Sequence, residues 1–337
     1  MTTILRTELC DRLGIEYPII LAGMGGVSMH RLVAAVSNAG GLGVLGAATL
    51  DAEGLRREIH KIRELTDKPF AVDLLAPIPD MIRPQMQVIF EEGVKIFVAG
   101  LAVPKEFIQE MHERGMTVIV MTGKVEHAIK AERAGADMVA AQGTEAGGHT
   151  GEVGTLALVP QTVDAVRIPV IAAGGIADGR GVVAALALGA QGVIMGTRFI
   201  ATPEAQAAPE YREAILRSGE SDTIRTRCYT GKPARAIRNP YNEAWERRRD
   251  EILPFPAQVA YSIQEGVMDY MGVGRGADPE RTFMPAGQGM GLIREIKPAA
   301  EVVRDVVREA EEVLVRLASR VPIEMRAARG QSTAAAS

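Results

Sequence analysis

The chain has 337 residues, of which 47% are hydrophobic and 24% charged, so it can bury a full globular core without covalent staples. Its net charge is −4 with acidic and basic residues mixed, which argues against a nucleic-acid-binding or membrane-surface protein. The two cysteines are isolated, so neither a disulfide framework nor a metal site is predicted, and no apolar run reaches the roughly 20 residues of a membrane-spanning helix.

A repeated unit runs through the first part of the chain. A helix-like stretch ends near a glycine, and a short β-branched run follows, as in residues 92–98 and 114–120. Glycine is expected at such helix ends because it tolerates the left-handed conformation. The runs are apolar and do not alternate, which is typical of strands buried on both faces of a parallel sheet. Eight strands are thus predicted, at 18–21, 41–46, 69–74, 94–98, 117–121, 137–141, 169–173 and 191–195.

Amphipathic helices are predicted between these strands. Leu55, Ile59 and Ile62 recur at helical spacing after Asp51, the expected N-cap, and Ser28 is expected to cap the preceding helix in the same way. Eight β/α units in succession indicate an α/β fold, a (β/α)8 TIM barrel. A doubly wound open sheet is the alternative.

The domain organisation follows from where this pattern stops. Residues 1–200 are predicted to form the barrel. The following 201–290 hold several prolines and most of the aromatic residues, and are predicted as a mainly helical lid or substrate domain inserted over the barrel mouth. Helical periodicity then returns, so 291–325 is expected to be a C-terminal helix packed on the barrel, and 326–337 a flexible tail. The apolar positions of the last helix predicted to face the core are Ile296, Val303, Val306 and Val307.

Two glycine loops follow the seventh and eighth predicted strands, where TIM barrels commonly bind phosphate. They are Gly174-Gly175 and Gly196-Thr197. Glycine lets the backbone approach an anion, exposed N–H groups hold it, and Thr197 can add a hydroxyl. Either loop alone could be a tight turn, but the two together predict a phosphate site. The Gly41–Gly46 run fits a dinucleotide pattern, but it is itself a predicted strand and carries little weight.

His149 is the one histidine in a predicted strand-end loop, among glycines that leave its ring unshielded. An imidazole there can take a proton near neutral pH, which makes His149 the candidate catalytic residue. The alternative is a histidine that only bonds a loop carbonyl. The other four, expected on surface helices, are His30, His60, His112 and His127.

These motifs resemble the signatures of the nitronate monooxygenase family, formerly called 2-nitropropane dioxygenases, and most closely its first class. The resemblance covers nearly the whole chain and is carried by residues 24–28, 35–43, 143–151, 169–181, 195–199, 234–239 and 286–289. The same signatures also resemble FMN-dependent enoyl-ACP reductase II and certain NADH:quinone reductases.

The resemblance implies a non-covalent FMN in the barrel mouth and the oxidation of alkyl nitronates, with nitroalkanes as further candidates, by O2. His149 matches the catalytic histidine of the family. The cofactor-binding positions that it implies are Gly23, Met24, Asp73, Gln142, Gly148, Ala173, Gly174, Gly175, Gly196 and Thr197. The alternative function is NAD(P)H-dependent reduction of an enoyl thioester or a quinone. A flavin-binding protein without catalysis is disfavoured by the complete loops together with His149.

Asp73 departs from the family pattern, in which the third strand usually ends in an asparagine that contacts the flavin. An ionised aspartate accepts a hydrogen bond from the flavin N3–H but cannot donate one to a ring oxygen. Its negative charge also opposes the reduced flavin and lowers the flavin's reduction potential. The resemblance therefore leaves flavin tuning and substrate open.

The expected partners are a small-molecule substrate and O2, or NAD(P)H under the alternative function, with no nucleic acid and no membrane. Residues 1–12 lack the apolar core of a signal peptide, so a cytoplasmic protein is expected. A homodimer is one assembly that the sequence leaves open. Aromatic residues of the insertion are expected to shape an apolar substrate cavity. The candidates, each of which could instead only pack within the insertion, are Tyr229, Tyr241, Tyr261 and Tyr270.

Overall fold

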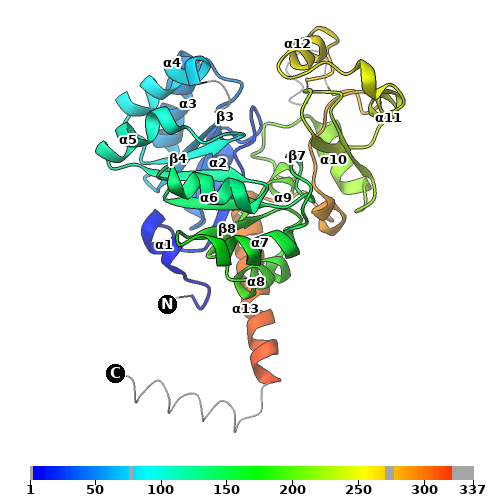
Figure 1. Ribbon diagram of the computed structural model, residues 1–337. Helices are drawn as coiled ribbons and strands as arrows, with labels where there is room; N and C mark the ends of the chain where they lie inside the picture. Colours follow the sequence, from blue (N-terminus) through cyan, green and yellow to red (C-terminus); the bar gives the residue numbers. More distant parts are fainter. Residues whose placement is uncertain (1–2, 76–78, 270–276, 321–337) are drawn as a thin grey trace, which may run out of the picture.

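An eight-stranded parallel barrel lies at the centre of the computed structural model, which describes residues 3–75, 79–269 and 277–320 (Figure 1). Its strands follow the order β1-β9-β8-β6-β5-β4-β3-β2. Backbone hydrogen bonds of Leu42 with Ile19 and Leu21 close the ring between β1 and the start of β2. The predicted TIM barrel is therefore confirmed, and each predicted strand overlaps an observed one. The strands are β1 Ile19–Leu21, β2 Gly43–Gly46, β3 Phe70–Leu75, β4 Ile96–Gly100, β5 Thr117–Thr122, β6 Met138–Gln142, β8 Val170–Ala173 and β9 Gly192–Met195.

Helices cover the outside of the barrel, except for α1, which packs against the inward-facing residues at one end of it. Leu9, Cys10 and Leu13 of α1 pack with the inward-facing strand residues such as Ile20 and Val44, so α1 fills the amino-terminal end of the barrel. A cavity can then open only at the carboxyl ends of the strands. The helices are α1 Glu8–Leu13, α2 His30–Asn38, α3 Ala52–Leu65, α4 Pro79–Glu91, α5 Lys105–Glu113, α6 Val125–Arg133, α7 Thr155–Ala165 and α8 Gly179–Ala187.

The two predicted helix caps have different outcomes. The Asp51 carboxylate accepts a hydrogen bond from the Gly54 N–H at 2.7 Å, so the cap of α3 is confirmed. Ser28 as a cap is wrong, because Met29 occupies that position and Ser28 is fully buried. Its hydroxyl instead accepts from the Met24 N–H at 2.8 Å and donates to the Met24 carbonyl at 3.2 Å. Ser28 therefore fixes the loop after β1, at the mouth of the barrel.

The predicted surface position holds for three of the four remaining histidines but is wrong for His30. The His30 side chain is half-buried, and its Nδ1 lies 2.7 Å from Glu58 Oε2, which joins α2 to α3. The exposed histidines are His60, His112 and His127.

The insertion after β9 contains several short helices and also strands that the sequence did not predict. Its β10 and β11 form an antiparallel hairpin, and β7, Gly148–His149 of the barrel loop, pairs with β11 as a third strand. Strands this short carry too few alternating positions to be recognised from a local pattern. Figure 1 shows α10, α11 and α12 gathered apart from the barrel helices. The elements are α9 Thr197–Ile200, α10 Pro209–Arg217, β10 Thr223–Thr226, β11 Ala234–Ile237, α11 Pro240–Glu246, η1 Arg249–Glu251, α12 Ala257–Gln264 and η2 Gln288–Leu292.

The last helix, α13 Ala299–Ser319, packs against α8 and α2 and so takes the place of the eighth barrel helix. It buries Val303, Val306 and Val307 as predicted. Ile296 is 42% exposed, so its predicted core position is wrong: the helix begins only after Pro298. The predicted tail, 326–337, lies outside the described residues. No helix in the described ranges is long and apolar enough to cross a membrane.

Candidate functional site

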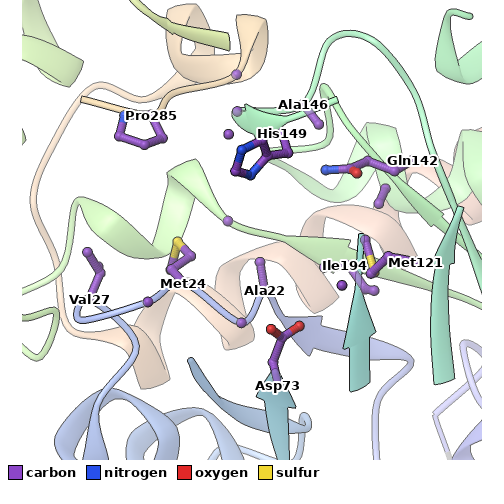
Figure 2. Close-up of a pocket in the computed structure, with 18 of the residues that line it drawn as sticks. Ala22, Met24, Val27, Asp73, Met121, Gln142, Ala146, His149, Ile194 and Pro285 are labelled. Carbon is purple, nitrogen blue, oxygen red and sulfur yellow. The ribbon is translucent and has the colours of Figure 1, made fainter. Parts of the chain in front are cut away.

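A cavity of about 400 Å³ opens at the carboxyl ends of the barrel strands, within the size range of small-molecule sites (Figure 2). Its floor is made by inward-facing barrel residues such as Ile20, Val98, Ile119, Met121 and Ile194. Every catalytic and cofactor-binding position predicted from the sequence lines this one cavity. They are Gly23, Met24, Asp73, Gln142, Gly148, His149, Ala173, Gly174, Gly175, Gly196 and Thr197.

The loops after β8 and β9 form a backbone cradle on one wall. Gly174 and Gly175 have φ of +105° and +72°, a region that other residues rarely adopt. A Cβ on Gly174 would lie 2.9 Å from Thr155 Oγ1 and 3.0 Å from the Gly143 carbonyl oxygen, so a side chain there would have no room. The cradle has the shape that a phosphate group needs for close approach to backbone N–H groups.

A segment returning from the insertion, residues 286–289, packs against the cradle and lines the cavity with Gly287 and Gly289. The Gly287 N–H donates to Thr197 Oγ1 at 2.9 Å, and the Gln288 N–H donates to the Glu145 carbonyl at 2.9 Å. Because Thr197 accepts from Gly287, its own hydroxyl hydrogen can be directed to an anion. The segment carries part of the family resemblance, but its residues were not among the predicted site positions. It both supports the cradle and forms part of the cavity wall.

His149 lies on β7 and points into the cavity (Figure 2). Its Nε2 is 3.0 Å from Thr230 Oγ1, and the Thr230 hydroxyl donates to the Lys232 carbonyl at 3.1 Å. Thr230 has one hydroxyl hydrogen, so this arrangement favours Nε2–H of His149 as the donor between the two side chains. The tautomer that results leaves the Nδ1 lone pair without a partner among the described residues.

Burial sets the charge state of His149. Desolvation, with a smaller contribution from the positive charge of Lys232, lowers the pKa of His149 to about 4. The near-neutral titration expected of an ordinary histidine is therefore wrong for His149, because its imidazole stays neutral well below pH 7. The unprotonated ring is the form that can accept a proton, so the catalytic role of His149 stays a prediction.

Asp73 points into the same cavity from the carboxyl-terminal half of β3 (Figure 2). Its side chain is 7% exposed and has no hydrogen-bond partner among the described residues. Burial raises the pKa of Asp73 to about 8. The ionised aspartate assumed from the sequence is therefore wrong at neutral pH, where the carboxyl is protonated. Gly23 packs directly on it, since a Cβ at position 23 would lie 2.3 Å from Asp73 Cβ.

The insertion supplies an apolar roof, but not from the predicted tyrosines. Tyr229 and Tyr241 stack on each other with ring centroids 5.6 Å apart, and Tyr261 meets the edge of Trp245. None of these three lines the cavity, so their predicted role is wrong. Tyr270 lies outside the described residues. No local sequence signal separated these tyrosines from the residues that do form the roof, which are Tyr211, Phe255, Val259, Met268, Phe283 and Pro285.

Comparison with known proteins agrees with this geometry. The family model described as nitronate monooxygenase matches residues 6–309. A probable nitronate monooxygenase of Staphylococcus saprophyticus is 36% identical, over 93% of this chain and 99% of the relative. The structure of FabK from Thermotoga maritima is similar at a TM-score of 0.86 and 40% identity, covering 94% of this chain and 99% of that one. Nitroalkane oxidase from Streptomyces ansochromogenes is similar at a TM-score of 0.81 and 31% identity, covering 92% and 99%.

Proposed function

Because the chain belongs to the nitronate monooxygenase family and is an oxidoreductase, we propose that it oxidises alkyl nitronates with O2 by means of bound FMN. The observation that carries the proposal is the single cavity that joins the glycine cradle to the unpaired Nδ1 of His149. A phosphate anchor and a neutral base thus face one space. Residues 1–200 would form the FMN-binding barrel and 201–290 the lid or substrate domain.

The residues present fit FMN. The cradle of Gly174, Gly175, Gly196 and Thr197 would hold its single phosphate through backbone N–H groups and one hydroxyl. FMN, when bound, supplies the electron transfer that amino-acid side chains cannot. The remaining positions proposed to contact it are Gly23, Met24, Asp73, Gln142, Gly148 and Ala173.

His149 would prepare a neutral substrate for oxidation. A nitroalkane must lose its α-proton, and Nδ1 of His149 is the unprotonated acceptor in the cavity, whereas an anionic nitronate has already lost this proton. The apolar roof would exclude water from the reacting atoms. The Lys232 ammonium lies 4.8 Å from the ring centroid of Phe255, which lines the cavity, so a positive charge beside the roof favours an anionic substrate.

The cofactor is tested directly by purification. The protein is expected to be yellow and to release FMN rather than FAD on denaturation, because the cradle provides for one phosphate and the sequence has no dinucleotide fingerprint in the right context. Chromatography of the released flavin identifies it. A colourless protein that takes up no added FMN would contradict the proposal.

Thr230 is expected to act as a positioning residue for His149. Thr230→Val removes the acceptor for the buried Nε2–H and so loosens control of the tautomer. A lost hydrogen bond of about 1 kcal/mol predicts a roughly fivefold lower kcat for a neutral nitroalkane, with the nitronate rate nearly unchanged. Thr230→Ser, which keeps the hydroxyl, is the matched control and should retain the rate. Equal rates for the Val and Ser variants would show that Thr230 does not orient His149.

A second candidate function is NAD(P)H-dependent reduction of an enoyl thioester or a quinone, favoured by the 40% identity to FabK. Under this function His149 would position or protonate the acceptor. Mixing the protein with NADH without oxygen separates the two functions. Rapid bleaching of the flavin favours the reductase, and an unchanged spectrum with turnover of propionate 3-nitronate in air favours the monooxygenase.

A further inference from the structure

Asp73 lies across the barrel from the phosphate cradle. In the strand order, β3 is four strands from β8 in either direction, so the two ends are diametrically opposed. A ligand anchored by its phosphate at Gly174 and Gly175 and extending across the mouth directs its other end toward β3. For FMN, whose phosphate and ring lie at opposite ends, this places Asp73 on the ring side of the cavity.

No charge compensates a carboxylate at this position. The strands that flank β3 present Gly46 and Val98 opposite Asp73, and Gly23 covers it from the loop after β1. Among the described side chains that line the cavity, the ionisable ones are Asp73, His149 and Tyr211, and none of them is a cation at neutral pH. An unpaired buried carboxylate is costly, and protonation relieves the cost.

We infer that Asp73 is a neutral carboxylic acid that donates a hydrogen bond to the ring end of FMN, and that its ionisation makes flavin affinity and reduction potential depend on pH. This inference rests on the proposed FMN binding. A protonated carboxyl both donates and accepts, which matches the N–H and carbonyl groups on the pyrimidine edge of the flavin. Asp73 would thus supply the donor that an ionised aspartate lacks.

The sign of the pH dependence follows from the two protonation states. Below the pKa of Asp73, about 8, the donor is present and the site carries no charge. Above it, one proton leaves to solvent, the donor is lost, and the carboxylate disfavours the addition of electrons to the ring. FMN affinity and reduction potential are therefore both expected to fall as the pH rises through about 8.

The apoprotein provides a readout that does not involve FMN. The folded-state pKa of Asp73 lies above the unfolded value, so its contribution to stability is fully present below about pH 4 and is lost as the pH rises through about 8. Asp73→Asn keeps the shape of the side chain and removes the group that ionises. The apoprotein of this variant should therefore gain stability relative to wild type between pH 5 and 9.

The chain offers a matched control in Glu58. Its carboxyl is also 7% exposed, but it is paired with His30 and Lys61 on the outside of the barrel. Those partners lower the pKa of Glu58 although burial opposes them. Glu58→Gln therefore removes a buried carboxyl of equal exposure without changing the cavity, and should leave the pH dependence of FMN binding as in wild type.

The test measures FMN affinity by flavin fluorescence and midpoint potential by dye equilibration, from pH 6 to 9, for wild type, Asp73→Asn and Glu58→Gln. We expect the wild-type and Glu58→Gln Kd to rise at least tenfold over this range and the Asp73→Asn Kd to change less than twofold. The potential should fall more steeply with pH in wild type than in Asp73→Asn.

Curves of Kd and of midpoint potential against pH that run parallel for all three proteins would overturn the inference. Failure of every protein to bind FMN would overturn the proposed function instead, and the apoprotein unfolding curves would still decide whether Asp73 holds a proton.

Discussion

His149→Asn is expected to lower turnover of a neutral nitroalkane by roughly 10²–10⁴-fold, the usual contribution of a general base. Asparagine keeps a polar side chain near Thr230 but has no lone pair basic enough to take the α-proton. The nitronate should lose far less activity, because no proton remains to be removed. FMN content should barely change, since other loops hold the phosphate. Steady-state rates on both substrate forms, normalised to bound flavin, make the comparison.

The pH profile gives a second measure of the same role. Only the unprotonated ring accepts a proton, and the pKa of His149 is lowered to about 4 by burial. The wild-type rate on a neutral nitroalkane should therefore rise with pH through about 4 and then stay level through neutral pH. Equal losses on both substrate forms in the Asn variant would mean that His149 positions substrate or tunes the flavin. Loss of FMN together with activity would give His149 a structural role.

Gly175→Val is expected to weaken FMN binding at least tenfold, which is about 1.4 kcal/mol. Gly175 has φ of +72°, where a β-branched residue is strained, and its Cβ would lie 3.3 Å from Glu145 Cβ. The new side chain would also stand between the backbone and the phosphate. Titration of the apoprotein with FMN measures the effect.

A matched control, Gly93→Val, separates the loss of phosphate binding at the cradle from the effect of backbone strain. Gly93 has φ of +62° and open space around its Cβ position, and it does not line the cavity. Gly93→Val therefore carries a similar backbone strain, and it should lower stability but leave FMN affinity unchanged. If Gly175→Val keeps wild-type affinity, or if both variants lose it equally, the phosphate is not held by this cradle.

A barrel strand is buried on both faces, so it appears in the sequence as a short run of apolar residues. For this reason the strands of the barrel could be predicted from the sequence. The run at Val170–Ala173, for example, is apolar at every position, and the glycine loop after it can be read from local residues alone. Because all parallel strands end at the same side of the barrel, the sequence predicts that the strand-end residues lie together, and the cavity contains them all. The sequence by itself thus determined the barrel, the loops and the position of His149.

Contacts between distant parts of the chain decided the rest, since no local pattern encodes them. Thr230 meets His149 from 81 residues away, and the two-residue strand β7 exists only because β11 pairs with it. The pKa values of His149 and Asp73 depend on burial, which is a property of the assembled cavity and not of neighbouring residues along the chain. The charge state of the site, and with it the chemistry that its residues can perform, was therefore determined only by the tertiary structure.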